Sequence, residues 1–441
     1  MANRTESVDQ DTLTLSIIQL DHSIKQIDST IVDTTSRVFD DLSCSTPSGA
    51  LHSVVQSSSP PQLRAKMEKS IMRFLRDPDR WTSFASVLLK SLAFHRSVDP
   101  TIGMSSATNV MEGNPSTIEI LQLAIMDDNE KKLPIVDLPR TKYNRPYLPQ
   151  LDGQTSSPSN GTQANGGENR NSVMNVSHQY PWICMAQQQL DSTATNDTSL
   201  KSTQMLLGVD LVVFNARLSK YKPTIDDFLK SFKRSFTSWE WERINHRQSP
   251  SMWSGHTSST RSRTEQSKLK EFFLRWSMKE AYTKALGLGM NINFDEFDTR
   301  LDGVDVNVDG DTLRGQHEGI WTAIMKQEVC DRKGQCQFSV IGKVTRTKPT
   351  VSWEYWEFIF VPLGDGSSQD RLVRETPASH LSSLESQYNA CACICRGPLA
   401  KSAMNDSAKT CTPTVIESLT LVDLIKSHGS NSLIKSEHSC Q

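Results

Sequence analysis

The sequence predicts an α+β protein, on three observations. A β-branched, alternating stretch at 12–20 predicts an early strand. Apolar residues at helical spacing over 268–286 predict a long helix that ends at Gly287, where a left-handed cap is expected. Later apolar runs at 319–325, 336–344, 353–363 and 388–395 predict further strands. Helices and strands are therefore both expected.

The remaining elements follow in chain order. Helical spacing over 63–96 predicts a helical region, in which Pro78 opens a helix rather than interrupting one. Buried strands are expected at 172–186 and 206–214, and a helix around Phe228 and Phe232. Two segments are too polar to bury apolar surface: 153–171, expected as a disordered insertion, and 249–266. The stretch 398–441 is expected to be a loose tail, apart from a short helical patch at 419–425.

Composition and charge narrow the class of protein. A formal net charge of -2 argues against general nucleic-acid binding. No run approaches the ~20 apolar residues of a membrane span, and the polar amino terminus lacks the features of a secretory signal, so a cytoplasmic protein is expected. Basic residues are nevertheless in excess at 217–247, eight against four acidic, and at 261–284, seven against three. These excesses are either solvated helix faces or a surface for an acidic partner.

The nine cysteines are odd in number, scattered and without C-x-x-C pairs, which favours reduced thiols over disulfides or a zinc site. Cys391, Cys393 and Cys395 alternate, as residues on one face of a strand do. A second candidate metal motif begins at Asp305 and resembles the opening of a calcium loop, but Gln316 stands where that loop needs glutamate. A polar hairpin turn is the favoured interpretation.

Two segments carry the chemistry. Asp210 closes an apolar run and is either a turn cap or a carboxylate directed at a cation. Trp276, Glu280 and Lys284 are spaced i, i+4, i+8 on the predicted helix and so share a face. That spacing is common in surface ion pairs, but a carboxylate with an ammonium also suits a site for phosphate and Mg²⁺.

Together these segments resemble the signature of the 4′-phosphopantetheinyl transferase superfamily, G-[IV]-D followed by [FW]-x-x-K-E-[AS]-x-x-K. Here the two parts are Gly208-Val209-Asp210 and Trp276-x-x-Lys279-Glu280-Ala281-x-x-Lys284. Two upstream segments are similar to the family's coenzyme A contacts. The first is basic and comprises Arg140, Thr141, Lys142, Tyr143, Asn144 and Arg145; the second comprises Asn175, Val176, Ser177 and His178.

The resemblance is greatest to the eukaryotic, aminoadipate-semialdehyde-dehydrogenase type of transferase, which links it to lysine biosynthesis through aminoadipate. It implies a monomer with a pseudo-twofold pair of α+β halves, 12–205 and 206–397, and the active site in the cleft between them. The implied reaction is Mg²⁺-dependent transfer of phosphopantetheine from coenzyme A to a serine of an acidic acyl or peptidyl carrier protein. Family members hold the metal and coenzyme A through residues matching Asp210 and Glu280, with Lys279 and Lys284 as further coenzyme A contacts.

The resemblance also assigns roles and leaves two alternatives open. Glu280 or a metal-bound water is the candidate base, and Lys284 is the candidate stabiliser of the leaving phosphate. Val212 stands where many bacterial members have a second acidic residue, so the metal site has two carboxylates. A non-catalytic carrier-binding module with the same fold is the alternative function, although Asp210, Glu280 and Lys284 are all present.

Overall fold

A computed structural model describes residues 13–20, 61–74, 76–98, 133, 135–140, 146, 148, 171–190, 205–215, 224–245, 260–306, 319–330, 337–346, 354–364, 388–399, 414–419, 421, 424 and 427. The chain divides into two compact units. One comprises Met1–Ser202 with Thr412–Gln441, and the other Thr203–Cys411. Each is described by itself.

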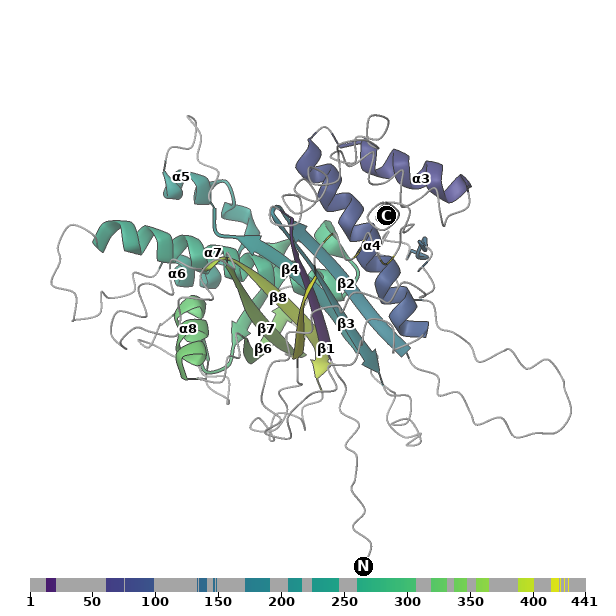
Figure 1. The fold of residues 1–441 in the computed structure, drawn as a ribbon. Helices are drawn as coiled ribbons and strands as arrows, with labels where there is room; N and C mark the ends of the chain where they lie inside the picture. Colours follow the sequence, from purple (N-terminus) through teal and green to yellow (C-terminus); the bar gives the residue numbers. More distant parts are fainter. Residues whose placement is uncertain are drawn as a thin grey trace, which may run out of the picture. The chain divides into compact units, whose positions relative to one another are not determined.

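The first unit is built on a four-stranded sheet with the order β2-β3-β1-β9. Its strands are β1 (Leu13–Gln19), β2 (Asn171–Gln179), β3 (Trp182–Leu190) and β9 (Thr414–Leu419). β1 is antiparallel to β3 and parallel to β9. The helices of this unit are α3 (Pro61–Met72) and α4 (Asp77–Val98) (Figure 1). They supply the other half of the core, where Phe84 and Leu88 of α4 cluster with Met174 of β2.

The second unit contains a five-stranded antiparallel sheet with the order β4-β8-β7-β6-β5. Its strands are β4 (Leu206–Val213), β5 (Phe297–Leu301), β6 (Phe338–Arg346), β7 (Glu354–Gly364) and β8 (Tyr388–Leu399). Its α-helices are α5 (Ile225–Lys230), α6 (Ser238–Asn245), α7 (Thr260–Ala285) and α8 (Ile320–Cys330). α7 lies along β4 and β8 (Figure 1). Short 3₁₀ turns η2 (Lys233–Ser235), η3 (Gly289–Asn291) and η4 (Phe294–Glu296) connect these elements.

The α+β class is confirmed, with both strands and helices in each unit. The strands predicted at 12–20, 206–214, 336–344, 353–363 and 388–395 correspond to β1, β4, β6, β7 and β8. Pro78 is the second residue of α4, as predicted for a proline that opens a helix. The pseudo-twofold relation between halves and the cleft between them stay predictions.

Three predicted segments differ from the structure. The apolar run at 319–325 was predicted as a strand but begins α8, because a short buried run has no period that separates strand from helix. The polar segment 249–266 was predicted as an insertion, yet α7 already begins at Thr260. The stretch 398–441 was predicted as loose, but β9 completes the first sheet and Leu421 and Leu424 are buried in that unit's core.

The alternating cysteines lie in β8 on the face that packs into the core of the second unit. Burial raises the pKa of the Cys393 and Cys395 thiols, which keeps them in the unreactive protonated form. Cys184 is also buried and is not in a disulfide with another described cysteine. Among the helices of the described ranges, none is both long and apolar enough to cross a membrane.

Candidate active site

The glycine of the first motif brings strand β4 into direct contact with helix α7. A Cβ atom at Gly208 would lie 2.0 Å from the carbonyl oxygen of Ala281 and 2.4 Å from the backbone nitrogen of Ala285. No side chain fits at those distances, so only glycine permits this approach. The two parts of the sequence signature therefore meet at Gly208 and Ala281, which places the carboxylate of β4 beside the polar residues of α7.

Asp210 and Lys284 form an ion pair at that junction. Successive strand residues point to opposite faces, so Asp210 shares with Gly208 and Val212 the face of β4 that packs on α7. The Lys284 ammonium lies 2.6 Å from Asp210 Oδ1, with 27% of the lysine side chain and 9% of the aspartate side chain exposed. The aspartate is thus neutralised by a cation, and the turn-cap alternative is not needed to explain it.

Glu280 is the third member of this group. It lies one helical turn before Lys284 and is partly buried. Burial, and then the negative charge of Asp210, raise the pKa of Glu280 from 4.5 to about 7, and Lys284 partly offsets the rise. One ammonium cannot neutralise two ionised carboxylates, so a proton on Glu280 is retained to a higher pH than on an isolated glutamate.

Trp276, the aromatic residue of the signature, packs into the core and not toward this site. Its ring centroid lies 5.2 Å from that of Phe294 and 5.4 Å from that of Phe232. On a helix with 3.6 residues per turn, each step of four residues rotates the side-chain direction by about 40°. Trp276 and Lys284 are two such steps apart, so they point in directions that differ by about 80°. The role of Trp276 is to anchor α7 against the aromatic cluster.

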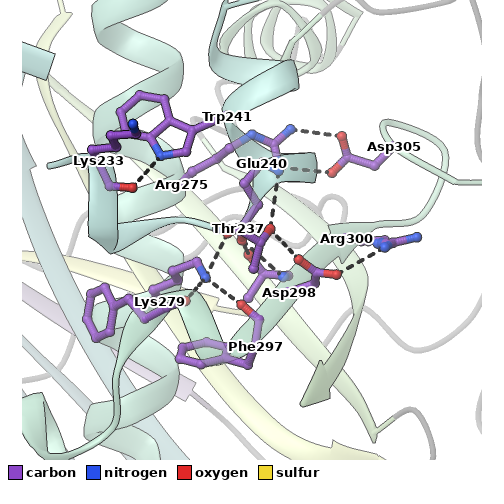
Figure 2. A network of polar contacts seen from close by, with 12 residues as sticks. Lys233, Thr237, Glu240, Trp241, Arg275, Lys279, Phe297, Asp298, Arg300 and Asp305 are labelled. Carbon is purple, nitrogen blue, oxygen red and sulfur yellow. Dashed lines mark hydrogen bonds and ion pairs between the residues drawn. The ribbon is translucent and has the colours of Figure 1, made fainter. Parts of the chain in front are cut away.

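Lys279 has a different environment from its neighbour Glu280. Its side chain is fully buried, and its ammonium lies 2.7 Å from Glu240 Oε2 and donates to the carbonyl oxygens of Phe294 and Phe297 at 2.5 Å (Figure 2). These three acceptors use all the donors of an ammonium. The prediction that Lys279 contacts coenzyme A therefore has no support in this geometry, and the residue instead fixes α7 to its neighbours.

Glu240 of α6 completes that arrangement. It has no exposed surface, and besides Lys279 it accepts hydrogen bonds from the backbone nitrogens of Thr237, at 3.1 Å, and Thr299, at 3.2 Å. The sequence pattern did not single out Glu240, because it lies 39 positions before its lysine partner and within an ordinary amphipathic helix.

Much of the basic excess at 261–284 is internal. Arg275 is buried and donates to Glu271, at 2.8 Å, and to both carboxylate oxygens of Asp305 (Figure 2). Asp305 is thereby occupied by a guanidinium, and the calcium-loop interpretation of this segment loses its first ligand; residues 307–318 lie outside the described ranges. In the excess at 217–247, by contrast, Lys230, Lys233 and Arg234 are exposed.

The upstream segments belong to the first unit. Arg140 is exposed and forms an isolated bridge with Pro146; its neighbours Thr141, Lys142, Tyr143, Asn144 and Arg145 lie outside the described residues. On β2, Asn175 and Ser177 are buried, Val176 packs against the core, and His178 is exposed. The predicted coenzyme A contacts of this unit are thus positioned by β2 and by the segment that ends at Arg140.

The residues at the β4–α7 junction fit a magnesium ion. The carboxylates of Asp210 and Glu280 are hard oxygen donors, and a divalent cation would offset the burial and the Asp210 charge that raise the pKa of Glu280. Across the described ranges, no group of three or more His, Cys, Asp or Glu side chains is arranged for a metal. Two protein carboxylates are adequate for Mg²⁺, which keeps several waters.

Comparison with known proteins finds similarity in the part of the chain that contains this junction. Residues 206–324 match the family model of the 4′-phosphopantetheinyl transferase superfamily, and this span contains both parts of the signature. A protein of Thraustochytrium sp. named phosphopantetheinyl transferase is 23% identical over 167 residues, which cover 38% of this chain and 43% of the relative. The chain therefore aligns with less than half the length of that protein.

Proposed function

We propose, from the superfamily domain at 206–324, that this chain is a 4′-phosphopantetheinyl transferase that moves the phosphopantetheine arm of coenzyme A to a carrier-protein serine in the presence of Mg²⁺. The observation that carries the proposal is the junction of β4 and α7, where Asp210, Glu280 and Lys284 come together from two distant motifs. A non-catalytic binding module has no need for this combination of charges.

The reaction makes three demands on the protein: a proton must leave the serine hydroxyl, the diphosphate must be oriented, and the departing phosphate must be stabilised. Glu280 suits the first role, because it is a carboxylate at the junction that can accept a proton, with a pKa of about 7 in the absence of metal. Lys284 suits the third, because its partly exposed ammonium can donate to an anionic leaving group.

Asp210 would hold the metal together with Glu280. When bound, Mg²⁺ neutralises charge on the diphosphate and orients it. Asp210 also sets the position of Lys284 through their ion pair, which leaves the lysine side chain partly exposed beside the two carboxylates. Arg140 and the β2 residues Asn175, Ser177 and His178 are proposed to hold the nucleotide end of coenzyme A.

The acceptor is proposed to be an acyl or peptidyl carrier domain with an acidic surface, and the enzyme to act as a cytoplasmic monomer. The test is to incubate the purified protein with coenzyme A, Mg²⁺ and apo carrier domains from fatty-acid, polyketide, peptide and aminoadipate-reducing systems. Intact-mass analysis should show the added phosphopantetheine on at least one carrier. Folded protein that modifies none of them would refute the proposal, and the carrier modified fastest identifies the acceptor class.

A further inference from the structure

Asp210 and Lys284 form an ion pair between two groups that the fold holds with different firmness. Asp210 lies inside strand β4, and only 9% of its side chain is exposed. Lys284 lies in the last turn of α7, its ammonium is carried on a flexible four-carbon stem, and 27% of its side chain is exposed. If the pair opens, the ammonium is therefore the group that moves.

Lys279 shows the contrasting case of a fixed lysine on the same helix. Its side chain is fully enclosed, and its ammonium contacts the Glu240 carboxylate and the carbonyl oxygens of Phe294 and Phe297. Those acceptors all belong to the protein and hold the ammonium in place. Lys284 is partly exposed instead, so its ammonium can move to a second anion without crossing the core.

The oxygen that pairs with Lys284 belongs to a proposed metal ligand. The ammonium lies 2.6 Å from Asp210 Oδ1, whereas Mg²⁺ binds carboxylate oxygens at about 2.0–2.1 Å. Two cations on that one oxygen would lie within about 5 Å of each other. Because Asp210 is nearly buried, little solvent is present to screen their charges. Their repulsion favours one cation at a time on this oxygen.

We propose that Lys284 is an exchangeable counter-ion of Asp210, which competes with the metal ion for this carboxylate and leaves it when the metal binds. The released ammonium needs a new anion, and a phosphate of coenzyme A supplies one. The inference rests on the proposed function for the metal and for the phosphate. Its new content is that metal binding and phosphate binding strengthen each other through one lysine.

The direct test measures metal binding to the full-length protein without coenzyme A and without turnover. Mn²⁺ is the probe in place of Mg²⁺, because the electron paramagnetic resonance signal of free Mn²⁺ reports how much is bound. The variant Lys284→Met keeps the length of the side chain and removes its charge. It should bind Mn²⁺ at least about tenfold more tightly than the wild type. Lys284→Arg, which keeps the charge, should bind nearly as the wild type does. Unchanged or weaker binding by Lys284→Met would overturn the exchange.

Lys268 offers a closely matched control on the same helix. Its ammonium also lies 2.6 Å from a carboxylate oxygen, that of Asp226, and 24% of its side chain is exposed. Asp226 is on α5 and is not a proposed metal ligand. Lys268→Met should therefore bind Mn²⁺ as the wild type does. An equal gain in affinity for both variants would assign the effect to net charge and would refute competition at Asp210.

A double variant separates competition for Asp210 from repulsion across the whole site. In an Asp210→Asn background the contested carboxylate is absent, while Glu280 still attracts the metal. Lys284→Met should then raise Mn²⁺ affinity by less than about twofold. A gain as large as in the wild-type background would show that the lysine acts by longer-range repulsion, and the exchange would be wrong.

A titration with coenzyme A present tests the coupling. Saturating coenzyme A should raise the Mn²⁺ affinity of the wild type by a larger factor than that of Lys284→Met, because only the wild type has an ammonium to transfer to a phosphate. Equal factors would rule the coupling out. Transfer to a carrier by a wild type whose Mn²⁺ affinity does not depend on Lys284 would overturn the exchange alone. Exchange at Asp210 without transfer to any carrier would refute only the proposed function.

Discussion

The Lys279 ammonium lies 2.7 Å from the Glu240 carboxylate, and both side chains are fully enclosed. Lys279 directly precedes Glu280, so this pair fixes the helix at the position from which Glu280 and Lys284 project. Adjacent residues of one motif thus have separate tasks. Lys279 faces inward and holds α7 to α6 and β5, and Glu280 faces the β4 carboxylate.

Removal of one partner of this pair should be strongly destabilising. Lys279→Met leaves the Glu240 charge buried and uncompensated, and we expect a loss of about 3–5 kcal/mol in the free energy of unfolding of this unit. Adding Glu240→Gln should recover part of the loss, because the charge disappears while an amide oxygen still accepts from Thr299. Urea denaturation measures both. The control is Lys268→Met, whose partner Asp226 is 67% exposed and whose loss should cost under about 1 kcal/mol.

Gly208→Ala tests the contact between β4 and α7. The added Cβ would overlap backbone atoms of Ala281 and Ala285, which cannot move without displacing the helix. We expect a loss of at least about 1–3 kcal/mol in stability together with weaker metal binding, because Asp210 and Glu280 move apart. The control Ala281→Gly removes a buried methyl group from the same stretch of α7 without adding atoms to the contact, and should cost only about 1 kcal/mol. Wild-type stability and metal affinity in Gly208→Ala would show that the approach is less close than described.

The strands and the paired signature could be predicted from the sequence because they depend on local pattern and on motif spacing. β4 has a continuous apolar run, and the helix of Glu280 and Lys284 has a clear period. The burial of Lys279 could not be predicted, since a lysine beside a glutamate on a helix has the pattern of a solvated face. Its partner Glu240 is distant in sequence, and only tertiary packing pairs them.

Tertiary contacts also explain the other differences between the predicted elements and the structure. β9 follows a polar stretch and joins the sheet by pairing with β1, roughly four hundred residues earlier, a relation that no local window contains. α8 begins in an apolar run that suits either state, and its packing against α7 decides the outcome.

The raised pKa of Glu280 predicts a specific dependence of stability on pH in the absence of metal. Its folded-state pKa, about 7, lies above the ordinary value of 4.5, so the folded protein holds this proton more tightly. The Glu280 proton therefore stabilises the folded state. This contribution to the free energy of unfolding is at most about 3 kcal/mol; it is fully present below pH 4.5 and is lost as the pH rises through about 7. Glu280→Gln should lack this contribution. Urea midpoints at pH 5, 6, 7 and 8 in the presence of a chelator test this, and parallel profiles for the two proteins would contradict it.

Association with an acidic carrier should depend on Lys233 and Arg234, the exposed cations before α6. The association rate should fall as salt rises from about 0.01 to 0.15 M, where the Debye length shortens from roughly 30 to 8 Å. The double variant Lys233→Glu/Arg234→Glu should associate more slowly and lose most of the salt dependence. Stopped-flow fluorescence measures the rates, with Lys69→Glu as the control. A salt-independent rate for the wild type would rule out electrostatic steering.

The last prediction separates metal binding from proton removal at the junction of β4 and α7. If Asp210 acts only as a metal ligand, Asp210→Asn should lower Mg²⁺ affinity and coenzyme A affinity together, and high Mg²⁺ should restore much of the turnover. Glu280→Gln should behave differently, because added metal restores occupancy but not the lost base, so its turnover should stay low at saturating Mg²⁺. Lys284→Ala should bind coenzyme A and metal but turn over slowly, since the departing phosphate loses an ammonium that now lies 2.6 Å from Asp210. Turnover of each variant is measured against Mg²⁺ with coenzyme A saturating. Full recovery of Glu280→Gln at high Mg²⁺ would assign proton removal to a water molecule and leave Glu280 as a metal ligand alone.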